Sequence, residues 1–360
     1  MSTVGNLLYR LLLKYSPTGR EEEAVEELSR WASEKGLQTW IDGIGNVYIS
    51  PPGPKRALVL LAGHIDTVEG WIEPGIDAGR VWGRGAVDAK GPLASMAAAI
   101  LELSRENPGC PAAAVGLVGE EGDSRGAWFL VSQNGVPPYV VIGEPSGGDR
   151  VVVGYRGGFH AEIECRGAGG HSSSPAIGDS ALDKAVRLYI ALKNAYPGEE
   201  PGKPSAAVTG LESGEAWNVL PRKALLRVDV RVPPGHSLES VKDELARLAG
   251  DHGCSTRFSQ GVPPIRVKTG DPVPRSLVRS LLQQGVRPRP VVKMGTSDMN
   301  ILGPRSESIA AYGPGDPRMA HTGYEEVSIR ELELAVKVYS GAVRYLCRST
   351  GKASAAELPS

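Results

Sequence analysis

Short apolar runs alternate with helical patterns in the first part of the chain. Residues 57–62, 112–118 and 139–143 are almost entirely apolar and have the length of strands that are buried on both faces. Between these runs, a stretch from 92 to about 104 and another at 124–133 have helical character. Because regular alternation of strands and helices is typical of α/β proteins, we predict a mostly parallel, doubly wound sheet.

The pattern before this region predicts two helices and a hairpin. Leucines recur at helical spacing in 5–15, and the segment 20–35 has an acidic first turn and is followed by glycine. Strand-like residues at 38–41 and 46–50 flank Asp42-Gly-Ile-Gly, which is typical of a β-hairpin turn.

The pattern changes at about residue 152. Apolar and polar residues alternate in 159–165 and 224–232, as in strands with one face in solvent. Helical patterns at about 179–194 and 237–250 accompany them, which predicts a separate α+β domain with both helices on one face of a small sheet. A final helix begins at about Ile329, and we expect the small, polar tail at 349–360 to be disordered.

Composition excludes several functional classes. The chain has 40 basic and 41 acidic residues, so its balance does not favour nucleic acid as a partner. No apolar run approaches the ~20 residues that span a bilayer, and the N-terminus lacks a signal-peptide pattern, so we expect a soluble, cytoplasmic protein. Abundant Arg, Pro and Glu with little Asn and Gln suggest a thermophilic source. The widely spaced cysteines are expected to be reduced thiols: Cys110, Cys165, Cys254 and Cys347.

Histidines and acidic residues follow the apolar runs directly. Since the carboxyl ends of parallel strands meet at one edge of a sheet, we expect these side chains to converge on one crevice. A glycine-rich turn before a predicted helix and a late His-Thr-Gly segment add two more candidates. The full set is His64, Asp66, Asp88, Glu120, Glu121, Glu144 and His321.

These residue types suit a pair of divalent metal ions. Imidazole nitrogens and carboxylate oxygens are common ligands, and one group usually bridges the two ions. We assign His64 and Glu144 to one metal, Glu121 and His321 to the other, and Asp88 to the bridge.

Two further acids receive supporting roles. Asp66 is placed to accept the imidazole N–H of His64 and fix its tautomer. Glu120 neighbours a ligand and is assigned as the general base that takes a proton from the attacking water.

Each motif alone has an ordinary structural explanation. A lone histidine is often a surface residue, Glu120-Glu121 could begin a solvated helix, and Asp88 could be a turn or N-cap residue. Their joint occurrence at three strand ends favours the metal site, because carboxylates that follow buried apolar runs are costly unless they are paired or bind metal.

The motifs, taken in order, are G-H-x-D, G-R-G-x-x-D-x-K-G, G-E-E, G-E-P, G-G-H-S-S-x-P and a late H-T-G. This order resembles the dinuclear-zinc deacylase and aminopeptidase family, which includes succinyl-diaminopimelate desuccinylase, acetylornithine deacetylase and glutamate carboxypeptidase. The likeness covers about residues 1–348. It implies two zinc ions, with cobalt as an alternative, and the ligand roles given above.

The resemblance also implies a domain order. A catalytic domain of residues 1–153 plus 265–348 would carry an inserted lid domain at 154–264, through which such enzymes often form homodimers. In the lid, His171 matches a histidine that stabilises the oxyanion, usually in the partner's active site. Three further positions match residues that bind substrate: Asn218, Arg231 and Thr296.

The segment Lys293-Met-Gly-Thr-Ser-Asp-Met-Asn is similar to one branch of this family. Those enzymes release lysine or ornithine from a small acidic amino-group carrier protein in lysine and arginine biosynthesis. Basic residues near the segment either steer such a carrier or form an ordinary solvated face: Arg287, Arg289, Lys293 and Arg305.

Three other functions stay open. The chain could remove acyl groups from free N-acetyl-lysine, N-acetyl-ornithine or succinyl-diaminopimelate, or it could be a dipeptidase. A non-catalytic binding module would require a missing base or ligand, and all of these are present.

Overall fold

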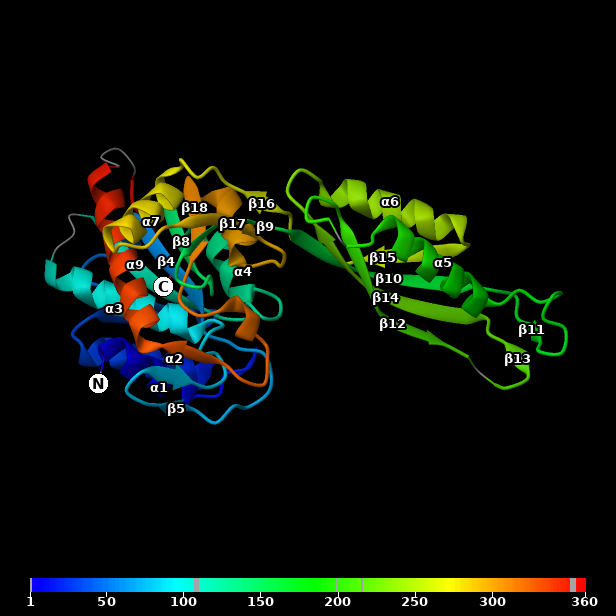
Figure 1. Ribbon diagram of the computed structural model, residues 1–360, viewed down its shortest axis with the longest axis horizontal. Helices are drawn as coiled ribbons and strands as arrows, with labels where there is room; N and C mark the ends of the chain where they lie inside the picture. Colours follow the sequence, from blue (N-terminus) through cyan, green and yellow to red (C-terminus); the bar gives the residue numbers. More distant parts are fainter. Residues whose placement is uncertain (1, 107–109, 199, 215, 350–353) are drawn as a thin grey trace. The chain divides into compact units, whose positions relative to one another are not determined.

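The computed structural model describes residues 2–106, 110–198, 200–214, 216–349 and 354–360. The chain divides into two compact units (Figure 1). The first unit contains Met1–Val153, Val267–Val291 and Ser297–Ser360, and the second contains Gly154–Arg266 and Val292–Thr296. The segment Val292–Thr296, which the sequence analysis places in the catalytic domain, therefore groups with the second unit. The assignment of catalytic and lid roles to the two units stays a prediction.

A mixed sheet lies mainly in the first unit. Its strand order is β1-β2-β7-β4-β8-β18-β9-β16, and β17 pairs with β9 beside this path. The strands are β1 (Gln38–Ile41), β2 (Val47–Ser50), β4 (Val59–His64), β7 (Ala112–Leu117), β8 (Tyr139–Gly143), β9 (Arg150–Tyr155), β16 (Ile265–Arg266), β17 (Arg289–Lys293) and β18 (Ser308–Tyr312).

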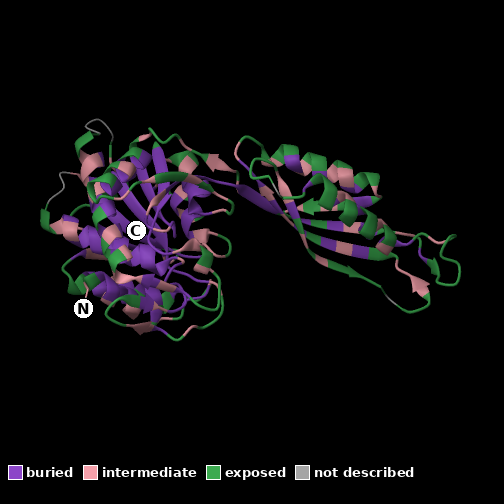
Figure 2. Cartoon of the chain, in the orientation of Figure 1, coloured by how far each residue is buried: buried purple, intermediate pink, exposed green. Residues whose placement is uncertain are grey.

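The middle of this sheet is parallel. β4 pairs in parallel with both β7 and β8, and β18 pairs in parallel with β8. The register sets His64 beside Leu117 and Gly63 beside Gly143, so β4, β7 and β8 end at the same level. Every residue of these three strands is buried, as expected for strands covered on both faces (Figure 2). The predicted α/β fold is confirmed, with a parallel core formed by β7, β4, β8 and β18.

Helices of the first unit bury one apolar face each. In α1 (Thr3–Leu12), the buried Val4, Leu7, Leu8 and Leu11 follow helical spacing. Burying each such leucine stabilises the fold by at most about 1.5–3 kcal/mol. The other helices are α2 (Glu22–Glu34), α3 (Lys90–Glu106), α4 (Arg125–Ser132), α7 (Pro272–Gln283), α8 (Asp298–Leu302) and α9 (Ile329–Ser349).

α3 connects the site to the core. It packs on β4, β7, α1 and α9, and its first residue directly follows the glycine-rich segment that contains Asp88. Short strands complete the first unit. They are β3 (Arg56–Ala57), β5 (Gly75–Ile76), β6 (Arg80–Trp82), β19 (Glu326–Ser328) and β20 (Ala356–Glu357).

The second unit is an antiparallel sheet with helices against it (Figure 1). Burial alternates along its central strands because one face packs on the helices and the other meets solvent. Serine N-caps open both helices, Ser180 for the first and Ser237 for the second. The elements are β10 (Gly157–Arg166), β11 (Gly170–His171), β12 (Ser205–Ser213), β13 (Val219–Leu220), β14 (Lys223–Val232), β15 (Cys254–Phe258), α5 (Ala181–Ala195) and α6 (Leu238–Asp251).

The C-terminal tail corrects one expectation. Residues 354–360 are not disordered: β20 pairs with β3, and the Trp40 indole N–H donates to the Pro359 carbonyl at 2.7 Å. These contacts satisfy backbone groups of the tail through partners some 300 residues away in sequence. The composition of the tail alone does not predict such distant pairing. The expectation for 350–353 lies outside the described residues.

The cysteines correct a second expectation, that all four are reduced thiols. Disulfides join Cys110 to Cys347 and Cys165 to Cys254, with sequence separations of 237 and 89 residues. The register of β10 and β15 sets Cys165 directly opposite Cys254. The prediction of free thiols was wrong because spacing along the chain does not report which strands become neighbours.

In the part of the chain that the structure describes, we find no helix with the length and apolarity of a membrane span.

The Cys165–Cys254 disulfide closes a loop of 89 residues within the second unit. We expect Cys254→Ser to lower the free energy of unfolding of this unit by about 2–5 kcal/mol, because the unfolded chain regains conformational freedom. Urea unfolding under oxidising conditions measures the change. Adding a reductant is the control, since it should lower the free energy of unfolding of this unit in the wild type to that of the variant. Equal stability under oxidising conditions would contradict the assignment of this disulfide.

Candidate metal centre

His64 ends β4 and is buried, with 2% of its side chain exposed. Its Nδ1 lies 3.0 Å from the backbone carbonyl oxygen of Asp66, so this nitrogen carries the proton and donates it. In the neutral imidazole Nε2 then has a lone pair, and in the protonated form it donates to the Asp88 carboxylate, 3.2 Å away. This tautomer leaves Nε2 available as a metal ligand.

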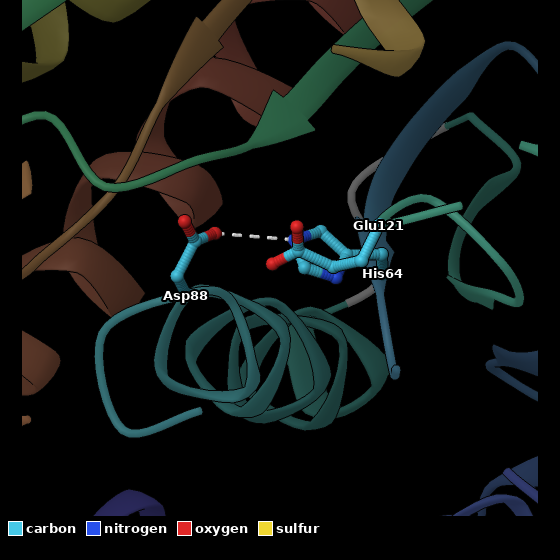
Figure 3. Close-up of side chains that lie close together, drawn as sticks. All are labelled: His64, Asp88 and Glu121. Atoms are coloured by element: carbon cyan, nitrogen blue, oxygen red, sulfur yellow. Dashed lines mark hydrogen bonds and ion pairs between the residues drawn. The ribbon is translucent and has the colours of Figure 1, made fainter. Parts of the chain in front are cut away.

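Asp88 and Glu121 meet His64 from two other segments (Figure 3). Asp88 lies just before α3, and Glu121 follows β7 after a turn at Gly119. One ligand atom from each of the three residues lies within 4.8 Å of the other two. The strand ends and the glycine-rich segment therefore converge as the sequence predicts.

His321 joins the cluster from the late segment. Its Nε2 lies 2.8 Å from Glu121 Oε1 and 3.5 Å from Asp88 Oδ2, while half of its side chain is exposed. Its backbone has φ +62°, a left-handed conformation that costs a non-glycine residue about 1–3 kcal/mol. Such strain is often found at functional sites. The exposure of His321 leaves the cluster open to solvent on this side.

Asp66 contacts His64, and it also holds the neighbouring turn. Its carboxylate lies 3.5 Å from His64 Nδ1, whereas the backbone carbonyl makes the shorter contact. The carboxylate also accepts the backbone N–H groups of Glu120 at 3.0 Å and Glu121 at 3.1 Å, and the Thr18 hydroxyl at 2.7 Å. Asp66 thus uses its backbone to orient His64 and its side chain to fix the turn that carries the two glutamates.

Glu120 and Glu144 bring further negative charge. Glu144 follows β8 and is buried, with its N–H donating to the Tyr312 carbonyl. Burial raises the pKa of Glu120 well above its usual value, and repulsion from Glu144 and Asp298 adds to this. Burial also raises the pKa of Glu121, with a further contribution from Asp88. For His64, burial is outweighed by its hydrogen bonds to Asp66 and Asp88, so its pKa rises.

These electrostatics fit a bound cation. Several carboxylates share a poorly solvated site, and each raises the pKa of its neighbours because like charges repel. A divalent ion would relieve this repulsion and favour the ionised carboxylates. The donor set of imidazole nitrogen and carboxylate oxygen is also the one that zinc accepts.

Asp298 belongs to this group and was not predicted as a site residue. It begins α8 behind the Ser297 capping box and is buried, and burial raises its pKa to about 7. Repulsion from Asp66 and Glu144 also raises its pKa. The sequence shows only an acid after Gly-Thr-Ser, and that pattern alone is equally typical of a helix N-terminus.

The remaining predicted residues form two pairs in the second unit. The backbone carbonyl of Asn218 accepts the N–H of Ser172, the residue after His171. His171 Nδ1 lies 2.8 Å from Ser173 Oγ. Arg231 donates to Asp229 at 3.0 Å and reaches the Thr296 hydroxyl at 3.5 Å.

The sequence profile of the peptidase family M20/M25/M40 matches residues 60–345. The chain belongs to this family. It is accordingly a metallohydrolase, and membership implies divalent metal ions. The prediction of a metal-dependent hydrolase is confirmed.

M20 relatives resemble the chain over most of its length. A protein of Aeropyrum pernix, provisionally named LysW-lysine/LysW-ornithine hydrolase, is 44% identical over 94% of this chain and 95% of its own. The LysW-lysine/LysW-ornithine hydrolase of Saccharolobus solfataricus is 37% identical over the same shares. Among solved structures, aminopeptidase PepT of Bacillus cereus has a TM-score of 0.79 at 21% identity and covers 96% of this chain and 98% of its own, which shows a shared fold.

The clustered ligands predict that zinc stabilises the folded protein. At a zinc concentration of 100 times Kd, linkage adds about 2.7 kcal/mol to the free energy of unfolding. We expect metal-stripped protein to melt at a higher temperature with zinc, and His64→Ala to lose most of this shift. The exposed His160, in the second unit, is the control, and His160→Ala should keep the shift. Equal zinc shifts in both variants would contradict the site.

Proposed function

We propose that this M20 hydrolase releases lysine or ornithine from LysW conjugates, and so acts in lysine or arginine biosynthesis. The names and 37–44% identity of the relatives from Aeropyrum and Saccharolobus support this substrate. It also matches the amino-group carrier conjugates that the sequence resemblance implies. The converging histidines and carboxylates carry the proposal, because they supply the ligands and the base that amide hydrolysis needs.

We assign two zinc ions to the site, with cobalt as an alternative. His64 and Glu144 would hold one ion, Glu121 and His321 the other, and Asp88 would lie between them. When bound, divalent ions polarise an amide carbonyl and make water more acidic.

Glu120 is the base in this proposal. It lies partly buried beside other acids, and both desolvation and their repulsion raise the pKa of its carboxyl group, which favours its taking up a proton. Glu120 takes a proton from the attacking water as the new C–O bond forms. It then passes this proton to the leaving amine as the amide C–N bond breaks, which yields the free amino acid and the carrier carboxylate.

We assign the substrate-binding residues to the second unit. We assign oxyanion stabilisation to His171 and contacts with substrate polar or carboxylate groups to Asn218, Arg231 and Thr296. The guanidinium fork of Arg231 suits a carboxylate. Its side chain is only partly exposed and already oriented by Asp229.

We propose a homodimer, and the positions of these residues support it. His171 and Asn218 lie by β13, just before β14 begins, whereas Arg231 is near the other end of that ten-residue strand. At ~3.3 Å per residue the two groups are roughly 30 Å apart, too far to contact one small substrate from the same chain. We therefore propose that His171 serves the active site of a partner subunit.

An apolar surface on the second unit is suitable for that contact. α5 exposes Val186, Tyr189 and Ile190, the last with 54% of its surface accessible. β12 is an edge strand of the same sheet, and edge strands can pair with a strand of another chain.

The carrier surface and the cellular location are also proposed. Arg287 and Arg305 are exposed and could attract an acidic carrier, whereas Arg289 is already paired with Asp149. A cytoplasmic location is compatible with two disulfides if the source is thermophilic, because intracellular proteins of hyperthermophiles are often disulfide-rich.

The substrate assignment is tested by hydrolysis assays of the zinc-loaded enzyme on four substrates in parallel. These are LysW-lysine, LysW-ornithine, N-acetyl-lysine and N-acetyl-ornithine. We expect higher kcat/KM on the carrier conjugates, and their ratio ranks lysine against ornithine. A preference for the free acetyl compounds would instead make the chain a small-molecule deacylase.

Glu120→Gln tests the assigned base. We expect kcat to fall by about 10²–10⁴, because Gln cannot accept and return the proton, while zinc content stays unchanged. Asp123→Asn is the control, since Asp123 lies in the same turn but is largely exposed. A loss of less than about tenfold in Glu120→Gln would contradict the role.

Mixed subunits test the dimer. We expect His171→Ala and Arg231→Ala each to be nearly inactive alone, the first by about 10²–10³ in rate. Co-refolding equal amounts should restore about a quarter of wild-type activity, because half of the dimers then contain one intact site. No recovery in dimers shown to be mixed would contradict a site shared between subunits.

A further inference from the structure

A buried ion pair lies next to the metal cluster in the first unit. Arg84 Nη1 donates to Glu325 Oε1 at 2.6 Å, and both side chains are almost fully buried. Arg84 Nε also donates to the Gly70 carbonyl at 2.8 Å. Neither residue is a ligand in the proposed centre, and neither is among the site residues that the sequence motifs predict.

The second oxygen of Glu325 is occupied by backbone. Glu325 Oε2 accepts the N–H groups of Gly85 at 3.1 Å, Val87 at 3.2 Å and Asp88 at 3.3 Å. The backbone carbonyl of Glu325 also accepts the Gly83 N–H at 3.1 Å. One carboxylate therefore fixes most of the glycine-rich segment that leads to Asp88.

Glu325 thus ties together the two segments that supply Asp88 and His321. It lies four residues after His321 along the chain, and it holds the amide of Asp88 itself. Those two ligands approach each other to 3.5 Å. Metal ligands need supporting hydrogen bonds to hold them within a fraction of an ångström of the binding geometry.

We propose that Glu325, clamped by Arg84, is a positioning residue that holds Asp88 and His321 in the metal-binding arrangement. This inference rests on the proposed metal centre and adds residues that do not touch the metal. It requires a carboxylate, because a glutamine of the same size would turn its NH₂ group toward either the Arg84 guanidinium or the three backbone N–H groups. Both arrangements oppose donor to donor.

The test is zinc affinity, measured on stripped protein by competition with a chelating dye. We expect Glu325→Gln to weaken zinc binding by about 10–100-fold, as is typical when a group supporting a ligand is changed. The matched control is Glu326→Gln. Glu326 is the next residue and also pairs with an arginine, Arg80 at 2.9 Å, but at the surface. Its variant should bind zinc within about twofold of wild type.

A second readout separates positioning from general stability. The melting temperature of each metal-free variant is measured in chelator, and zinc affinity is compared where all variants are fully folded. Weakened affinity in a folded Glu325→Gln protein supports the proposal. Wild-type affinity in that variant overturns it, as does an affinity loss no greater than that of Glu326→Gln.

Arg84→Lys keeps the test decisive if Glu325→Gln does not fold. Lysine preserves the charge beside Glu325 but loses the fork that also reaches Gly70, so we expect a loss of zinc affinity in the same direction. Unchanged affinity in Arg84→Lys would then overturn the proposal. If the wild type itself bound no zinc, the proposed metal centre would be the part that failed, and this inference would fail with it.

Discussion

The structure of the site depends on one electrostatic constraint, the crowding of acidic side chains at the carboxyl edge of a buried parallel sheet. β4, β7 and β8 end at the same level, so the residues that follow them cannot avoid one another. Burial and mutual repulsion both disfavour the ionised carboxylates. Two histidines offset part of this cost, and a divalent cation would offset more. The acids concerned are Asp88, Glu120, Glu121, Glu144 and Asp298.

The segments around the cluster are held by groups that do not bind the metal. Asp66 fixes the turn after β7 through two backbone N–H groups, and Glu325 fixes the segment before α3 through three. Charged acceptors make stronger hydrogen bonds than neutral ones, so these carboxylates are effective clamps. In the second unit, β14 separates Arg231 from His171 by its own length, and this separation is the basis of the proposal that two subunits share each active site.

Sequence patterns predict those features that depend on local order. The apolar run ending at His64, the glycine-rich segment before α3 and the amphipathic helices are each visible within about twenty residues. Other features cannot be read from local sequence, because they depend on which distant segments become neighbours. These are the pairing of Cys165 with Cys254, the strand at Ala356–Glu357 and the partners of Asp66. The sequence patterns did not predict Asp298 and Glu325 as site residues for the same reason, since their roles depend on burial and on contacts with residues far away in sequence.

Anomalous diffraction at the zinc absorption edge, on crystals of the zinc-loaded protein, would locate the bound ions. We expect strong peaks among His64, Asp88, Glu121 and His321, with one of the ions also bonded to Glu144. Peaks confined to other histidines, or none at this cluster in crystals shown to contain zinc, would contradict a metal centre at the strand ends.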